Sequence, residues 1–188
     1  MTGLRVLRAA EHDRMPWANG GGTTYQVATG PDGADLDTFD WRVSLADVDA
    51  GGPFSTFPGI DRVLMVIDGP GMALLVDGRF VPLGPLDPLT FDGAADTSCT
   101  LTGGPTRDLN LMTRRGRCTG TVDVLGVAGE VQVDPVEGGT VLALIVSGEA
   151  SADDLVLAPR DVLVVGHAVT LRGSATAALV TVRPAGPA

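Results

Sequence analysis

The chain contains two copies of one short β pattern. The first copy runs from VLMVIDG (63–69) to LGPLDPLTF (83–91), and the second from LALIVSG (142–148) to LAPRDVLVV (157–165). Each copy is an apolar run ending in a glycine turn, followed by Leu-x-Pro-x-Asp that leads into another apolar run. A supersecondary unit repeated within one chain predicts two similar substructures. The alternative is two unrelated hairpins that look alike.

The rest of the chain also favours strands. Short apolar runs are separated by clusters of Gly, Pro and Asp, which is typical of antiparallel sheets. Helical periodicity is confined to a short turn around Ala9 to Arg14. The predicted fold class is all-β, with two small antiparallel β-barrels or sandwiches, residues 1–116 and 117–188, packed as one compact unit. The expected strands cover 23–29, 41–48, 62–69, 72–78, 97–103, 107–114, 140–148, 153–165 and 175–184.

Charge and hydropathy exclude several classes of partner. The chain has 13 basic residues, all of them Arg, against 23 acidic ones, and a net charge of -10 repels nucleic acid. No stretch approaches the roughly 20 apolar residues of a membrane-spanning helix, and no signal-peptide pattern begins the chain. Two cysteines are too few for a disulfide scaffold, so we expect a cytoplasmic protein. A homodimer is compatible with such a fold, although no feature marks its edge.

The repeated strand and glycine turn resemble the cupin fold, which would make this chain a bicupin. Metal-dependent cupins carry two His and one Glu just before the strand that ends in the turn glycine. With Gly69 as that glycine, the positions hold Ser55, Phe57 and Asp61 or Arg62. These side chains cannot assemble a first-row metal site, which needs His, Cys or carboxylate donors. We therefore expect no metal and no other cofactor.

Functional side chains alternate with apolar ones on three predicted strands. Arg42 and Ser44 share one face of 41–48, Asn110 and Met112 share one face of 107–114, and Arg62 lies on 62–69. Both faces of a strand can be buried in a small barrel, where such groups need partners. The alternative is the solvated face of an antiparallel sheet. Arg is suited to bidentate recognition of a carboxylate, which favours a pocket.

Five segments together resemble the HutD/Ves family of bicupins. They are MPWANGGGTT (15–24), FDWRVSLADV (39–48), GPFSTFPGIDR (52–62), FDG (91–93) and RDLNLMTRRG (107–116), in the family's order. The resemblance implies a metal-free pocket in the first barrel that accepts a small anionic metabolite, such as formylglutamate or urocanate. It also implies a regulatory or accessory role in histidine degradation.

The chain departs from the family pattern in its N-terminal loop. Ala18 stands where the family usually has Lys, and Tyr25 and Gln26 stand where it has Arg-Glu. Gln26 keeps a hydrogen-bonding group but cannot act as a general acid or base. The ligand-binding candidates are thus Gln26, Arg42, Ser44, Ser55, Phe57, Arg62, Asn110 and Met112.

Two other functions stay open beside metabolite binding. A metal-independent isomerase, lyase or hydrolase acting on a small carboxylate would need a titratable group in the pocket, for which Asp108 and Asp61 are weak candidates. An interaction module without a ligand would instead fill its interior with ion pairs, such as Arg62 with Asp108 or Arg107 with Asp92.

Overall fold

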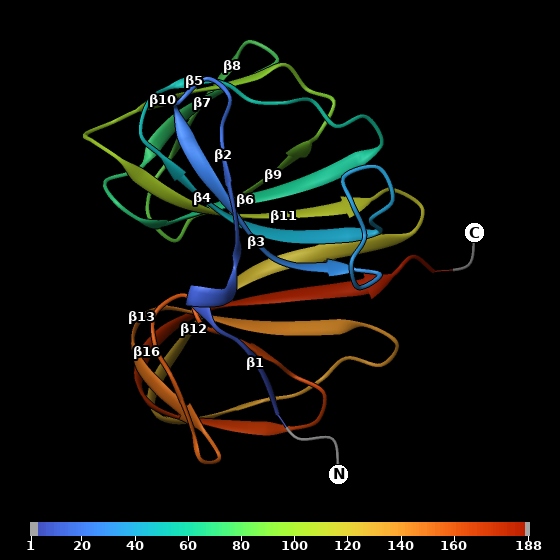
Figure 1. The fold of residues 1–188 in the computed structure, drawn as a ribbon, viewed down its shortest axis with the longest axis vertical. Helices are drawn as coiled ribbons and strands as arrows, with labels where there is room; N and C mark the ends of the chain where they lie inside the picture. The colour runs from blue at the N-terminus through green and yellow to red at the C-terminus, as the bar shows by residue number, and fades with distance from the viewer. Residues whose placement is uncertain (1–3, 187–188) are drawn as a thin grey trace. The chain divides into compact units, whose positions relative to one another are not determined.

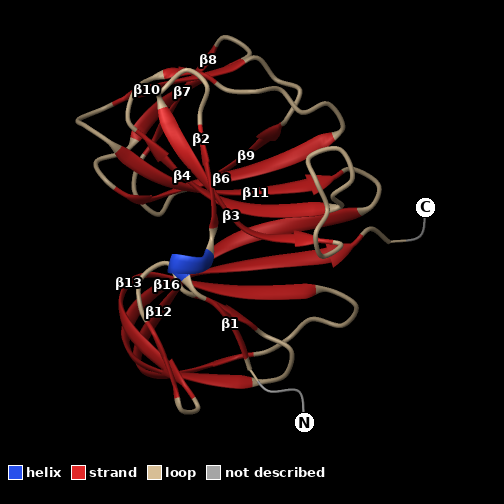
Figure 2. Cartoon of the chain, viewed as in Figure 1, coloured by secondary structure: helices blue, strands red, loops and turns tan. Residues whose placement is uncertain are grey.

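The computed structural model describes residues 4–186, which form antiparallel sheets joined by turns (Figures 1 and 2). Within that range the single helical element is a 3-10 turn, η1 (Ala9–Glu11). No helix in the described range is long and apolar enough to cross a membrane. The chain divides into two compact units, one of residues 13–119 and one that joins the segment up to His12 to the residues from Gly120 onward. The all-β prediction is confirmed.

The unit of residues 13–119 is a sandwich of two sheets. One sheet has the strand order β2-β3-β4-β11-β6-β9 and the other β5-β10-β7-β8. The strands are β2 (Asp13–Pro16), β3 (Gly22–Gly30), β4 (Trp41–Val48), β5 (Gly52–Pro53), β6 (Ile60–Asp68), β7 (Met72–Val76), β8 (Arg79–Leu83), β9 (Pro88–Asp92), β10 (Thr97–Leu101) and β11 (Thr106–Arg114).

An apolar core joins these two sheets. Val48 on β4 and Val66 on β6 pack in one cluster with Met72 and Leu74 on β7 and Cys99 on β10. Alternation along each strand directs these side chains to the inner face, as expected for a sandwich. The core occupies the end of the inner face formed by the last residues of β4 and β6.

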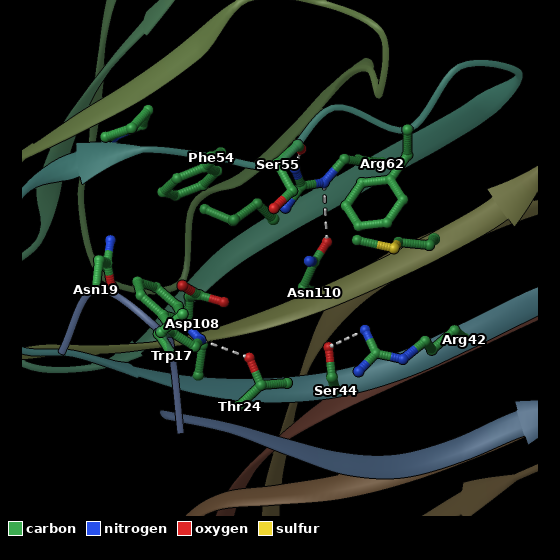
Figure 3. Close-up of a pocket in the computed structure, with 16 residues that line it drawn as sticks. Trp17, Asn19, Thr24, Arg42, Ser44, Phe54, Ser55, Arg62, Asp108 and Asn110 are labelled. Carbon is green, nitrogen blue, oxygen red and sulfur yellow. Dashed lines mark hydrogen bonds between the residues drawn. The ribbon is translucent and has the colours of Figure 1, made fainter. Parts of the chain in front are cut away.

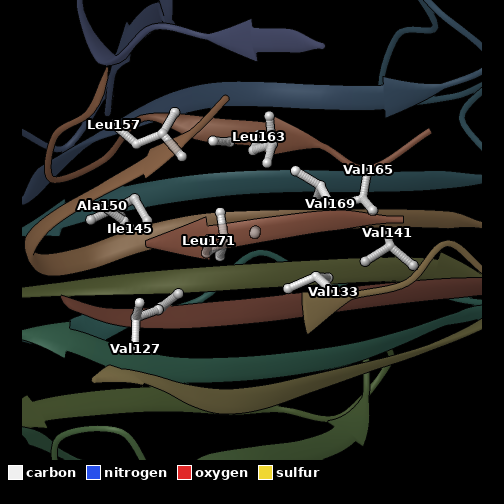
Figure 4. Packing of buried hydrophobic residues seen from close by; sticks show 13 residues of the cluster. Val127, Val133, Val141, Ile145, Ala150, Leu157, Leu163, Val165, Val169 and Leu171 are labelled. Carbon is white, nitrogen blue, oxygen red and sulfur yellow. The ribbon is translucent and has the colours of Figure 1, made fainter. Parts of the chain in front are cut away.

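The second unit is one sheet that encloses its own core. Its strand order is β1-β15-β13-β16-β12, with β14 paired to β13. Its strands are β1 (Arg5–Leu7), β12 (Cys118–Val133), β13 (Thr140–Ala152), β14 (Leu155–Leu157), β15 (Val162–Val164) and β16 (Val169–Pro184). Side chains from β12 to β16, Leu157, Leu163 and Leu171 among them, converge in one apolar cluster (Figure 4).

The internal repeat is visible in the strand pairing. β6 pairs antiparallel with β9, and β13 pairs in the same way with β15. In the alignment of the two copies, Arg62 corresponds to Val141 and Phe91 to Val165. Val141 and Val165 are buried members of the apolar cluster of the second unit. The repeated strand pair therefore carries a buried arginine in the first unit, whereas the corresponding position of the second unit belongs to an apolar core.

The N-terminal segment differs from the expected domain boundary. We predicted that residues 1–116 form the first barrel, but β1 pairs with β15 of the second unit, with Val6 opposite Leu163. The Asp161 carboxylate fixes this segment by accepting hydrogen bonds from the Ala9 backbone N–H and from Arg8. Arg8 and Asp161 are 153 residues apart, so no local sequence pattern could reveal the pairing.

Candidate functional site

The inner face of the six-stranded sheet changes character along its strands. On β4, Ala46 and Val48 belong to the apolar core, whereas Arg42 and Ser44, nearer the start of the strand, are buried polar residues. β6 repeats this change, because the buried Arg62 precedes Leu64 and Val66 of the core on the same face. The inner face thus has an apolar end, which the core covers, and a polar end, which the core leaves uncovered.

A cavity of about 400 Å³ lies over this polar end (Figure 3). Its size is within the range of small-molecule sites. Residues from β3, β4, β6 and β11 form its floor, and the loops before β3 and β6 contribute its rim. Its lining consists of Trp17, Ala18, Asn19, Thr24, Arg42, Ser44, Ala46, Pro53, Phe54, Ser55, Phe57, Arg62, Leu64, Asp108, Asn110 and Met112.

Strand register brings the polar side chains of the floor together. Met112 on β11 lies opposite Arg42 on β4 and opposite Arg62 on β6. Two residues earlier on β11, Asn110 lies opposite Ser44. Because neighbouring strands are about 4.8 Å apart, the two arginines start about 10 Å apart on either side of one strand. Both can therefore reach one small ligand.

Arg62 is held by aromatic rings rather than by a carboxylate. Its guanidinium carbon lies 5.0 Å from the ring centroid of Phe91, 5.3 Å from that of Phe54 and 5.8 Å from that of Phe57. Its Nε donates a long hydrogen bond of 3.4 Å to Asn110 Oδ1. The residue is only 4% exposed, and burial lowers its pKa to about 10. Within residues 4–186, no carboxylate forms an ion pair with it.

Arg42 is also buried among neutral partners. Its Nε donates to Gln26 Oε1 at 3.1 Å and its Nη1 donates to Ser44 Oγ at 3.3 Å. Burial lowers the pKa of this guanidinium as well. In the described part of the chain it has no carboxylate partner either, so its charge is stabilised only by dipoles.

Asp108 is the acidic residue of the lining. It lies on β11 opposite Ala46 and Val66, which offer no side-chain donor, and it is 2% exposed. Among the described residues, none donates a hydrogen bond to its carboxyl group. Burial raises the pKa of Asp108 to about 7, against the opposing effect of the positive charge on Arg62.

The cavity therefore carries a net positive charge in a chain of net charge -10. Arg42 and Arg62 supply two positive charges, and Asp108 supplies at most one negative charge. Burying an unpaired cation is costly unless a counter-charge arrives. The arrangement suits an anionic ligand that brings this counter-charge with it.

The structure brings most of the candidate residues together. Arg42, Ser44, Ser55, Phe57, Arg62, Asn110, Met112 and Asp108 all line the cavity. Gln26 lies behind it and contacts the site through Arg42. Asp61 does not take part, because it follows the opposite alternation from Arg62. Its side chain is 42% exposed and pairs with Arg115.

The ion pairs expected of an interaction module do not form among the described residues. Arg62 and Asp108 are not within ion-pair distance, and Arg107 pairs with Asp47 instead of Asp92. Asp92 pairs with Arg115 at the surface. The cavity arginines thus remain available to a ligand.

The loop of residues 17–21 forms part of the rim, although none of its side chains was among the predicted site residues. The Trp17 indole Nε1 donates to Thr24 Oγ1 at 2.8 Å, which fixes the ring beside the cavity (Figure 3). A Cβ at Gly22 would collide with the Asp47 backbone oxygen and the Trp17 ring, so this position requires glycine. The tryptophan beside a glycine run was the available signal, but loops have no periodicity to show where a side chain points.

No group of three or more His, Cys, Asp or Glu residues within 4–186 is arranged to hold a metal ion. Asp108 is the only carboxylate among the described lining residues, and no His or Cys lines the cavity there. The donor set of the cavity therefore suits hydrogen bonding and ion pairing rather than metal coordination.

Comparison with known proteins identifies relatives over most of the chain. A model of the HutD family matches residues 9–182. A protein from the region 3′ of hutC in Pseudomonas putida is 49% identical over 113 residues, which are 60% of this chain and 59% of that protein. Protein Ves of Cronobacter sakazakii is 36% identical over 152 residues, covering 78% of this chain and 80% of the relative. The chain thus spans less than two thirds of the Pseudomonas putida relative's length.

Solved structures agree with this relationship. The structure of HutD from Pseudomonas fluorescens SBW25 in a formate condition is 34% identical, with a TM-score of 0.83, and covers 98% of this chain and 100% of that chain. A cupin 2 conserved barrel domain protein from Leptotrichia buccalis is 10% identical, with a TM-score of 0.57, and covers 87% of this chain and 89% of its own. The second match concerns the fold alone, and it confirms the cupin-like architecture.

Proposed function

The chain belongs to the HutD family, and we propose that the unit of residues 13–119 binds a small anionic metabolite without a metal ion. The family is associated with the histidine-utilisation region. We infer a regulatory or accessory role in histidine degradation, with a formylglutamate-like or urocanate-like ligand. The observation that carries this proposal is a pair of buried arginines, Arg42 and Arg62, that line one cavity without a carboxylate partner.

The electrostatics of the cavity favour a carboxylate as the ligand's anionic group. A guanidinium presents several N–H donors in a planar fork that matches a carboxylate. The long 3.4 Å contact from Arg62 to Asn110 and the 3.5 Å contact to the Ser55 backbone oxygen are weak, so a ligand oxygen can replace them at little cost. In a buried site such charge-assisted hydrogen bonds are the strong ones.

The remaining walls suit a short organic body. Phe54, Phe57, Leu64 and Met112 are apolar, whereas Asn110 offers an amide to a polar group of the ligand. A cavity of about 400 Å³ can enclose a metabolite of the size of formylglutamate or urocanate. A carboxylate group and a short organic body are the features that both molecules share.

A thermal-shift experiment tests the proposal. Formylglutamate, urocanate and histidine are added separately to the wild-type chain and to Arg62→Met. We expect a carboxylate ligand to stabilise the wild type by about 2.7 kcal/mol at one hundred times its dissociation constant. Arg79→Met is the matched control, because Arg79 is an exposed arginine on β8 that does not line the cavity. The absence of any stabilisation at millimolar concentration would overturn the proposal.

One observation favours a second candidate, a metal-independent enzyme acting on a small carboxylate. The pKa of Asp108, raised by burial to about 7, suits a general acid or base at neutral pH. Asp108→Asn would then abolish turnover while leaving ligand binding in place. Unchanged turnover of a converted substrate in that variant would eliminate Asp108 as the acid or base.

A further inference from the structure

The side chain of Asp108 is not tied to the fold by a polar contact in the described part of the chain. Its carboxyl group lines the cavity, receives no hydrogen bond from the residues within 4–186, and forms no ion pair there. Buried polar atoms normally have at least one hydrogen-bond partner. Ala46 and Val66, its neighbours across β4 and β6, cannot supply them. A hydrogen-bond partner for this carboxyl group must therefore come from a molecule that enters the cavity.

The charged and titratable groups around Asp108 act in opposite directions. Arg62 on β6 attracts the ionised carboxylate, whereas Asp47 on β4 repels it. Cys99 on β10 is a buried thiol whose own pKa is raised by burial and, to a smaller extent, by Asp108. Arg42 on β4 lines the same cavity. The positive charge of Arg62 is thus the principal influence that keeps Asp108 ionised.

An anion bound in the cavity would cancel the stabilisation of ionised Asp108 by Arg62. When a ligand carboxylate pairs with Arg62, the guanidinium charge is compensated and no longer stabilises the Asp108 carboxylate. The ligand's own negative charge then repels it at close range. Both effects favour the neutral acid, which is also the only form of Asp108 that can donate a hydrogen bond.

We propose that ligand binding is coupled to protonation of Asp108, so that the cavity takes up one proton with each anion and the neutral acid donates a hydrogen bond to a ligand oxygen. The proton comes from solvent, and no covalent bond of the ligand changes. This inference rests on the proposed anion-binding function. With Asp108 neutral, the cavity holds two positive charges, those of Arg42 and Arg62, which matches a dianion such as formylglutamate.

Titration calorimetry tests the coupling. Formylglutamate is titrated into the wild-type chain at about pH 8 in triethanolamine and in Tris, two cationic buffers whose different ionisation enthalpies report the protons exchanged. Both carboxyl groups of this ligand stay ionised at that pH. We expect uptake of about one proton, with an affinity that falls about tenfold for each pH unit above 7.

Two variants assign the proton to Asp108. Asp108→Asn keeps the size of the side chain and offers a permanent donor, so proton uptake should vanish and the affinity should become independent of pH. Asp61→Asn is the control, because it removes an exposed carboxylate of the neighbouring strand and should leave the uptake unchanged. Proton uptake is measured on the wild-type chain, so the coupling can be tested even if Asp108→Asn does not fold.

The possible results separate the two proposals. Binding of formylglutamate without proton uptake overturns the coupling but leaves the anion site standing. Uptake that persists in a folded Asp108→Asn also overturns it, because the proton then binds elsewhere. If formylglutamate does not bind to the wild type, the proposal of a formylglutamate-like ligand is wrong, and so is the coupling that rests on it.

Discussion

Arg42 and Arg62 line the same cavity from β4 and β6, the two strands that flank β11. Neither arginine forms an ion pair with a carboxylate in the described part of the chain, and both have a pKa lowered by burial. Structural arginines are usually compensated by the fold itself. Two uncompensated ones in a single cavity are the observation on which the proposed anion binding rests.

Replacing Arg62 by methionine should weaken ligand binding without weakening the fold. Methionine keeps apolar contact with Phe54, Phe57 and Phe91 and removes a buried cation that lacks a carboxylate partner. We expect a loss of about 2 kcal/mol or more in binding free energy, about thirtyfold in affinity. Urea unfolding of the unliganded variant should show no loss of stability. A loss above about 2 kcal/mol would mean that Arg62 is structural.

Gln26→Glu should weaken anion binding through Arg42. Gln26 Oε1 accepts a hydrogen bond from Arg42 Nε at 3.1 Å, so a carboxylate at this position would compensate the guanidinium charge. We expect the dissociation constant of a carboxylate ligand to rise about tenfold, equivalent to about 1.4 kcal/mol. Calorimetry with the wild type and the variant measures this change. An unchanged affinity would show that Arg42 does not contact the ligand's charge.

The stability of the unliganded chain should fall as the pH rises from about 4 to about 7 because of Asp108. Burial raises the native pKa of this residue from 3.8 to about 7, so the native state binds the proton more tightly than the unfolded state. The stability this group contributes is complete below the unfolded pKa and is lost as pH rises through the native one, by up to about 4 kcal/mol. Urea unfolding of wild type and Asp108→Asn at both ends of this window isolates the effect. Parallel pH profiles would contradict it.

Asp161→Ala should destabilise the second unit, whereas Asp87→Ala should not. The two residues occupy corresponding positions of the internal repeat. Asp161 accepts hydrogen bonds from the backbone N–H groups of Ala9 and Ala158 and from Arg8, whereas Asp87 is exposed. We expect a loss of about 3 kcal/mol for Asp161→Ala and about zero for Asp87→Ala in denaturant unfolding. Equal losses would show that the aspartate stabilises the turn of the repeat itself and not the attachment of the segment that follows β1.

The side chains on the floor of the cavity could be predicted from the sequence, because side chains of a strand alternate between its two faces with a period of two residues. Arg42 and Ser44 fall on the inner face of β4, and Asn110 and Met112 fall on that of β11, as the pattern required. The same rule places Asp61 on the face opposite to Arg62, which explains why this weak catalytic candidate lies outside the cavity. Periodicity therefore identified which side chains share a face.

Periodicity could not identify what lies above that face. Trp17 and Asn19 come from a loop, and Phe54 comes from a segment with only a two-residue strand, so none has a pattern that fixes its direction. Pairing of β1 with β15 depends on contacts between the two ends of the chain. The long strand β12 was also missed, because its three glycines and its exposed residues conceal the apolar alternation.

The most direct test of anion recognition compares formylglutamate with its diamide in titration calorimetry against the wild-type chain. The two molecules have nearly the same shape, but the diamide carries no charge for Arg42 and Arg62 to bind. We expect saturable binding of the acid and a loss of at least about a hundredfold in affinity for the diamide, about 2.7 kcal/mol. Equal affinity for the two molecules, or binding of neither, would contradict it.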